Sequence, residues 1–211
     1  MRRTETRRAA GFTLIELLTV IAVIGILAAI LIPTVSSVRV SANKAKTKVQ
    51  FNQWAAAIES FRSEYGYYPA FHSSNLVNGG ATGVTDGEHL FHDILAGRKR
   101  DGSALSSGAA TQNRKRIAFY TFSEGDLTDA TAPVPNLIRD AFDNTEIAVL
   151  VDKNLDGRID GSDYPGGIPF VAGMKPGLDD IPTNGLRVRV AFYAPAPRAD
   201  ATNPQFIFSW K

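Results

Sequence analysis

Hydrophobic and polar residues are distributed unevenly along the chain, and the longest apolar stretch lies near the N-terminus. Between Phe12 and Val38 the single ionisable residue is Glu16, and residues 17–32 contain none. A helix needs about 20 mostly apolar residues to cross the hydrocarbon core of a bilayer. The pattern therefore predicts a membrane-spanning helix that begins near Phe12.

Past this stretch, hydrophobic residues recur every three or four positions, which indicates an amphipathic helix. A first set consists of Val35, Val38, Ala42, Ala45 and Val49, and after a shift of two residues a second set consists of Phe51, Trp54, Ile58, Phe61 and Tyr65. We expect one helix from Phe12 to Tyr65, about 80 Å long at roughly 1.5 Å per residue, with a bend allowed at Pro33 and a stop at Gly66. Residues 34–66 then continue the helix into a soluble head, on which the aromatic stripe packs.

The remaining residues, 67–211, have the pattern of a small head with one short helix. Residues 73–87 are rich in Ser, Asn and Gly and predict a loop. A short helix is expected between a cap at Asp86 and a stop at Gly97. Its apolar side consists of Leu90, Phe91, Ile94 and Leu95. The basic run that follows, Arg98, Lys99 and Arg100, predicts a solvated turn.

Four short segments of the head predict β-strands. They are residues 117–122, 147–151, 186–193 and 206–210. The second is continuously apolar and is expected to be central, whereas the last two alternate in the period of a half-buried strand. The predicted fold class is α+β, with a long N-terminal helix packed on a small antiparallel β-sheet.

Composition and charge exclude several classes of protein. With 44% hydrophobic and 21% charged residues the chain is not mostly disordered. It has no cysteine, which excludes disulfides, thiolate zinc sites and a cysteine nucleophile. The net charge of +2 divides into +3 over residues 1–11 and −1 over the rest, which carries 19 Lys and Arg against 20 Asp and Glu. We expect no nucleic-acid partner.

Signals for catalysis are weak. The sequence contains no GxSxG, P-loop or GxGxxG motif. His89 and His92 are three residues apart beside Glu88 and Asp93, which is half of a metal site, and His72 is the one histidine left to complete it. We expect no enzymatic activity, and we expect this histidine pair to lie on a solvated helix face.

The junction between the basic leader and the apolar stretch carries a specific motif. Residues 11–18 are Gly-Phe-Thr-Leu-Ile-Glu-Leu-Leu, and Pro33 lies at the end of the apolar run. This segment closely resembles the N-terminal signature of type IV pilins and type II secretion pseudopilins, and the chain is most similar to a major pseudopilin. The alternative is an ordinary signal anchor that happens to begin with these residues. A cleaved signal peptide fits poorly, because Ala28, Ala29 and Ile30 form only a poor cleavage site after the apolar run.

The resemblance implies how the chain is processed and assembled. A prepilin peptidase would cut between Gly11 and Phe12, remove residues 1–11 as a cytoplasmic leader and methylate the new N-terminus. Residues 12–33 would form the transmembrane and assembly helix, in which Glu16 meets the Phe12 amine of a neighbouring subunit. A carboxylate in a membrane segment is costly and marks function by default, although Glu16 is near enough to the helix start to reach water.

The resemblance also implies the location and partners. Arginines 2, 3, 7 and 8 are matched by four cations past the apolar stretch, so charge alone does not orient the helix. The family places such proteins in the bacterial inner membrane as single-pass chains with a cytoplasmic N-terminus and a periplasmic head. Assembly produces a filament of this chain and other pseudopilins on an inner-membrane assembly platform. Alternatives are a type IV pilin for adhesion or DNA uptake, a membrane-anchored calcium-dependent binding module and an anchored hydrolase.

One loop, residues 152–163, has the ligand spacing of a calcium-binding loop. Side-chain oxygens of Asp152, Asn154 and Asp156 occupy loop positions 1, 3 and 5, followed by a turn glycine at position 6. The further predicted ligands are the carbonyl of Arg158, Asp160 and Asp163. The flanks predict a strand and a Pro-Gly turn instead of two helices, so we expect a structural Ca²⁺ on a sheet. Major pseudopilins are known for such an ion, and the alternative is a polar turn without one.

Overall fold

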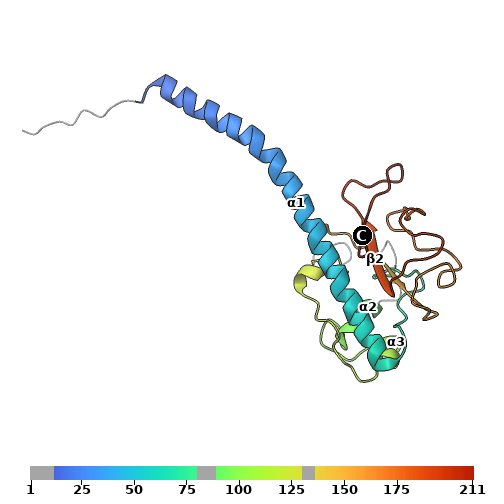
Figure 1. Cartoon of the computed structure of the whole chain (residues 1–211). Coiled ribbons are helices and arrows are strands. Elements are labelled where there is room, and N and C mark those ends of the chain that lie inside the picture. Colours follow the sequence, from blue (N-terminus) through green and yellow to red (C-terminus); the bar gives the residue numbers. More distant parts are fainter. Residues whose placement is uncertain (1–11, 80–88, 130–135) are drawn as a thin grey trace, which may run out of the picture. The chain divides into compact units, whose positions relative to one another are not determined.

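The computed structural model describes residues 12–79, 89–129 and 136–211 (Figure 1). The chain divides into two compact units, Met1–Ala42 and Asn43–Lys211. The helix α1 (Leu14–Tyr65) contributes to both units, continues through Pro33 and ends at the predicted residue. The predicted leader, residues 1–11, and the predicted cap Asp86 lie outside the described residues.

The first unit consists of the N-terminal part of α1, and its apolar side chains are exposed. The side chains of Leu14 and Ile32 are 81% and 71% exposed. Within the described part of the chain, α1 is the helix that is long and apolar enough to cross a membrane. Leucine and isoleucine at this exposure have no apolar environment in the unit, so lipid or other protein has to provide one.

In the head, the second part of α1 carries the aromatic face of the main core. Phe51, Trp54, Ile58 and Phe61 are completely buried, which confirms the predicted stripe. The indole ring of Trp54 packs edge-on against the ring of Phe192, with ring centroids 5.6 Å apart. The start of this helix segment is therefore fixed to a strand that lies about 140 residues later in the chain.

The first apolar set on α1 is exposed in the subunit, whereas the aromatic stripe is buried. Val38 and Val49 are 66% and 56% exposed. The buried positions at this level are polar: Thr47 is fully buried, and the Gln50 amide donates to Asp126 Oδ1 at 2.8 Å. The reason is the two-residue shift between the sets, which rotates the first set by about 200° at 3.6 residues per turn.

The sheet is antiparallel, as predicted, and has three strands in the order β1-β2-β3. They are β1 (Ala148–Val151), β2 (Val190–Pro195) and β3 (Phe206–Phe208). Val149 is paired with Phe192, and Tyr193 with Phe208. β2 begins later than the predicted start at Leu186, and Leu186 forms an isolated bridge with Ile159 instead.

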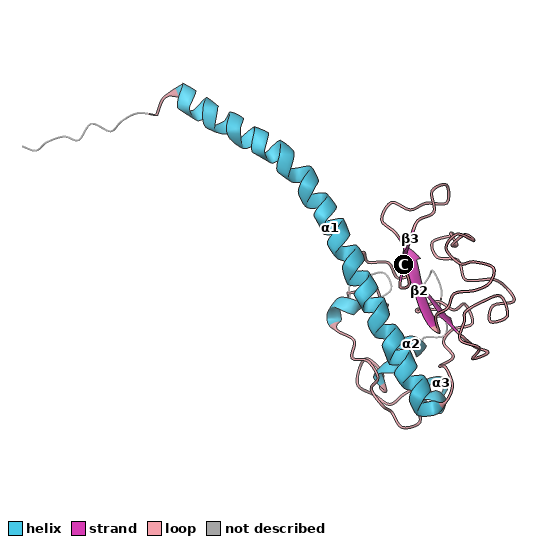
Figure 2. Ribbon diagram, in the orientation of Figure 1, coloured by secondary structure: helices cyan, strands magenta, loops and turns pink. Residues whose placement is uncertain are grey.

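Both faces of the sheet are buried, although the alternation predicted one exposed face. Val149 and Phe192 pack into the aromatic core beneath α1. On the other face, Leu150 and Tyr193 pack against Tyr164 and neighbouring residues of the long irregular segment between β1 and β2. Loops drawn in pink form much of the head around the strands (Figure 2). The sheet is thus a central layer covered by helix on one face and loop on the other.

The predicted strand at 117–122 is absent from the structure. The amides of Phe119 and Tyr120 both donate to the carbonyl of Leu95 at the end of α2 (Leu90–Ala96), at 2.8 and 3.0 Å. Asn113, which is fully buried, joins the same region by donating to the carbonyls of Ile94 and Ile117, each at 2.8 Å. Because these backbone groups serve the helix end, they are not available to a strand partner.

The short helix α2 matches the predicted apolar face and ends at Gly97, which adopts a left-handed φ of +68°. Two small helices follow that were not predicted, α3 (Ser107–Gln112) and the 3₁₀ helix η2 (Glu124–Asp126). The basic run after α2 is only partly solvated, because Arg98 is exposed whereas all three guanidinium nitrogens of Arg100 are buried. The expectation of a wholly solvated turn is therefore wrong.

Candidate functional site

The N-terminal segment contains two of the predicted functional residues, Phe12 and Glu16. Phe12 is 78% exposed and precedes the helix, whereas Gly11 lies outside the described residues. Glu16 Oε2 accepts hydrogen bonds from the backbone nitrogen and the hydroxyl of Thr13, at 2.9 and 2.7 Å. The Thr13 hydroxyl in turn accepts from the Glu16 amide at 3.3 Å.

This reciprocal arrangement is a capping box, in which a Ser or Thr at the N-cap and a Glu three residues later satisfy each other's backbone donors. The carboxylate of Glu16 therefore has a local role at the start of α1, in addition to the pairing that the resemblance implies. Thr13 was missed as a functional residue. The Thr-x-x-Glu spacing before the apolar run is the sequence signal that identifies it.

The second candidate site is the loop 152–163, which begins at the end of β1. Its first and last predicted ligands, Asp152 and Asp163, are 1% and 4% exposed. Asp156 is exposed, and Asp160 is half-buried. Gly157 has φ +88°, so the predicted turn glycine adopts the conformation that the loop requires. The loop is thus anchored at its two ends by buried carboxylates and turns at the expected position.

Backbone amides of the loop donate to these carboxylates. Asp152 accepts from Asp156 and Gly157, at 3.1 and 2.8 Å. Asp163 accepts from Lys153, at 2.7 Å, and from Asn154 and Asp160, at 3.1 and 3.0 Å. Such amide donors satisfy the oxygens of a buried carboxyl group. The loop is therefore a closed turn built around two buried carboxyl side chains.

The middle of the loop repeats the same local bonding. The Asn154 side chain accepts from the Asp156 amide at 3.0 Å, and Asp156 accepts from the Arg158 amide at 2.9 Å. The hydroxyl of Ser162, and secondly its amide, hold the pKa of Asp160 below its ordinary value. Arg158 directs its guanidinium to the carbonyl of Asn184 at 3.0 Å, away from the loop.

The donor set fits calcium in chemical type, because four carboxylates and one amide oxygen are concentrated in one turn. The side chains do not converge, however: within residues 12–79, 89–129 and 136–211, no group of three or more His, Asp or Glu is arranged to hold a metal ion. Exposed Asp156 and half-buried Asp160 would have to turn toward Asp152 and Asp163 to complete a shell. Calcium binding at this loop stays a prediction.

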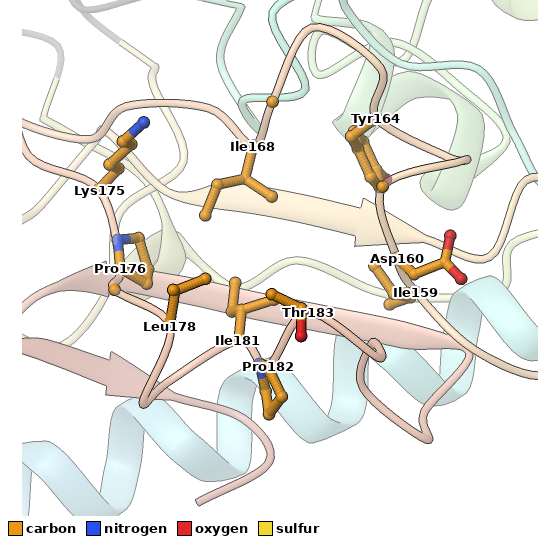
Figure 3. A pocket seen from close by; sticks show the side chains of 13 residues that line it. Ile159, Asp160, Tyr164, Ile168, Lys175, Pro176, Leu178, Ile181, Pro182 and Thr183 are labelled. Carbon is orange, nitrogen blue, oxygen red and sulfur yellow. The ribbon is translucent and has the colours of Figure 1, made fainter.

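An apolar cavity of about 500 Å³ adjoins the loop at Asp160. Ile168 on one segment and Leu178 and Ile181 on another point into the same space (Figure 3). The carboxylate of Asp160 points out of it (Figure 3). Among the described residues, the lining is apolar apart from a few polar groups, and it contains no histidine. Its chemistry is mainly that of an apolar surface.

The histidines predicted to lie on a solvated face are covered instead: His89 is half-buried and His92 is buried. His92 is 6% exposed, and its Nδ1 lies 2.9 Å from Asp93 Oδ1. Burial, and secondly the positive charge of Arg100, lower the pKa of His89 to about 4. The pair does not form a metal site with a third ligand in the described part of the chain. The solvated-face expectation is wrong because α2 is covered on nearly every side.

The N-terminal region matches the prokaryotic N-terminal methylation motif over residues 6–32. No curated protein and no solved structure matches the chain. The motif indicates a type IV pilin-like substrate of prepilin peptidase, and it covers both the predicted cleavage site and the Thr13–Glu16 capping box. The remainder of the chain, from Pro33 onward, lies outside the matched segment.

Proposed function

We propose that the mature protein is a structural filament subunit, a pseudopilin of a type II protein secretion system. One observation carries the proposal: the methylation motif at residues 6–32 coincides with an apolar helix segment whose side chains are exposed in the subunit. A helix of this kind is stable in a bilayer and, after assembly, among equivalent helices of other copies.

In this proposal, cleavage between Gly11 and Phe12 creates a new amine at the start of the assembly helix. A carboxylate inside an apolar segment costs several kcal/mol unless it is paired. Pairing with the Phe12 amine of a neighbouring copy would therefore lower the free energy of the Glu16 carboxylate as the helices leave the lipid. The capping box with Thr13 supports this geometry, because it holds the Glu16 carboxylate at the N-terminal end of α1.

The proposed partners are other copies of this chain, other pseudopilins, prepilin peptidase and an inner-membrane assembly platform. The proposed location is the bacterial inner membrane, with the leader in the cytoplasm and the head in the periplasm. A subunit of this kind is moved by its partners and needs no catalytic residue of its own.

A structural calcium ion at residues 152–163 is part of the proposal. Asp152, Asn154, Asp156, Asp160 and Asp163 and the carbonyl of Arg158 would hold it. Support comes from the ligand spacing, the two buried end carboxylates and the left-handed Gly157 at the turn. The ion would neutralise the four carboxylates and hold the loop against the sheet.

A type IV pilin for adhesion or DNA uptake is the second candidate, because the methylation motif does not separate it from a pseudopilin. The charge of the mature chain favours secretion over DNA uptake. Residues 12–211 carry 19 Lys and Arg against 20 Asp and Glu, which gives no net attraction for a polyanion. A calcium-dependent binding module on the same anchor is a third candidate, and it depends on the untested ion.

Two measurements test the proposal. Mass analysis of the membrane-extracted protein should find a chain that begins at Phe12 with an added methyl group. Gly11→Val should block the cleavage, so that the chain still begins at Met1. An intact wild-type Met1 start, or a cut near Ala29, would contradict the processing. Deleting the gene should then leave secreted enzymes in the periplasm; normal secretion with loss of surface pili would favour the adhesion or uptake pilin.

A further inference from the structure

The head contains a second cavity, of about 510 Å³, whose lining is basic. It lies between the end of α2 and residues 116–127. Cationic side chains from both sides line it: Arg98, Lys99 and Arg100 after α2, and Arg116 opposite. The volume is within the range of small-molecule sites, which is about 300–1,000 Å³.

These four cations have little to balance them. Glu124 is the one carboxylate among the described residues that line it. In the part of the chain that the structure describes, no ion pair joins any of the four to an acid. Four like charges around one hollow repel one another, and this repulsion becomes attraction when an anion lies between them.

Arg100 gives the strongest indication. All three of its guanidinium nitrogens are buried, and none has a hydrogen-bond partner. Burial lowers the pKa of Arg100 to about 10. Asp93, an acid whose charge acts on Arg100, directs its carboxylate to His92 at 2.9 Å. A buried cation without an acceptor is costly, and native proteins rarely retain one unless a ligand or ion satisfies it.

The walls of the cavity are held in place by backbone contacts. Gly97 approaches the carbonyl of Arg116 so closely that no side chain fits between them. The amide of Tyr120, another lining residue, donates to the carbonyl of Leu95 at 3.0 Å. These contacts fix the two basic segments relative to each other, so the site is formed before a ligand arrives.

We infer that this cavity binds the phosphate group of a small, multiply charged anion, with Arg100 as the principal donor. A guanidinium presents a planar fork that suits the oxygens of a phosphate, and the surrounding cations neutralise more than one negative charge. A concave site favours a small anion or an ester end over a nucleic-acid duplex, which needs an extended basic surface. This site is independent of the secretion role proposed above.

The experiment is isothermal titration of the full chain, in nonionic detergent, with sodium pyrophosphate at constant ionic strength. We expect saturable binding, and Arg100→Gln should weaken it about tenfold or more, as loss of a charge-assisted hydrogen bond does. Arg116→Gln should weaken it too. The matched control is Arg187→Gln, an exposed arginine outside the cavity, which should leave the affinity unchanged.

Two further ligands distinguish the possible sources of the phosphate group. Glycerol 3-phosphate represents a soluble ester, and a short-chain phosphatidic acid represents a lipid headgroup. Binding of either ligand that depends on Arg100 supports the site. The proposal is overturned if wild type shows no saturable heat, if Arg187→Gln loses as much affinity as Arg100→Gln, or if citrate binds more tightly than pyrophosphate. Melting curves check that each variant folds. If Arg100→Gln does not fold, the affinity of Arg116→Gln decides the result.

Discussion

A Cβ atom on Gly97 would stand 2.6 Å from the carbonyl oxygen of Arg116. Gly97 also has φ +68°, in the region that disfavours L side chains. We predict that Gly97→Ala lowers the free energy of unfolding by more than the roughly 1–3 kcal/mol expected for a strained left-handed residue. The additional loss arises because the backbone at Arg116 must also move to make room for the Cβ atom. Thermal or denaturant unfolding of the detergent-solubilised chain measures the change.

Gly66 provides the control, since it has a similar φ of +83° but nothing within 4 Å of an added Cβ. Gly66→Ala should show the backbone strain alone. Equal losses in the two variants would mean that the close approach of Gly97 to Arg116 contributes nothing to stability.

The sequence was sufficient to predict the elements whose hydrophobic period is strong. The aromatic stripe around Trp54, the stop at Gly97 and the strand at 148–151 each follow from local pattern, and the structure confirms them. Residues 117–122 have the same apolar character but bond to the end of α2. The local sequence pattern does not distinguish a strand from a segment whose amides donate to a distant carbonyl, such as that of Leu95.

The local sequence pattern also could not predict that the second face of the sheet is covered. Tyr164 and Val171 bury the face that carries Tyr193, yet their segment has no regular hydrophobic period. Among site residues, the capping box of Thr13 was readable from spacing. Arg100 was not, because its neighbours in sequence are polar and its burial depends on the tertiary position of residues 116–127.

We predict that Glu16→Gln impairs filament assembly while membrane insertion stays normal. Gln retains the hydrogen-bonding capacity of the capping box with Thr13 but removes the charge that would pair with a neighbour's Phe12 amine. Sheared filament fractions, compared with membrane fractions, measure assembly. Thr13→Ala is the converse variant, which keeps the charge and loses the cap; if it alone reduces filament yield, the role of Glu16 is local capping.

Acid is expected to destabilise the head through His89. Burial lowers its pKa to about 4, with the charge of Arg100 as the second cause, whereas an unfolded chain titrates near 6.5. Between these values the unfolded state binds a proton that the folded head does not, so stability is complete above about pH 6.5 and falls as the pH is lowered toward 4. In His89→Gln the melting temperature should depend less on pH in this window. Parallel curves for the two proteins would show that another group causes the loss.

We predict that calcium stabilises the head through the loop 152–163. Without the ion, four carboxylates repel one another in one turn, and only Lys153 and Arg158 lie among them in sequence. An ion that binds only the folded loop adds about 2.7 kcal/mol at about 100 times its Kd. The melting temperature of the full chain in detergent should therefore rise with calcium and fall with chelator, while magnesium, which prefers a smaller octahedral shell, should replace it poorly.

Asp156→Asn is the sharpest variant, because the amide oxygen can still accept from the Arg158 amide while the charge is lost. It should abolish the difference between calcium and chelator without a large change in the chelator melting temperature. Asp200 accepts two backbone amides in a similar exposed turn, so Asp200→Asn controls for the removal of one carboxylate and should retain the difference. Identical melting of wild type in calcium and in chelator would mean that the amides around Asp152 and Asp163 are sufficient to hold the loop. The predicted ligand spacing would then be that of a polar turn.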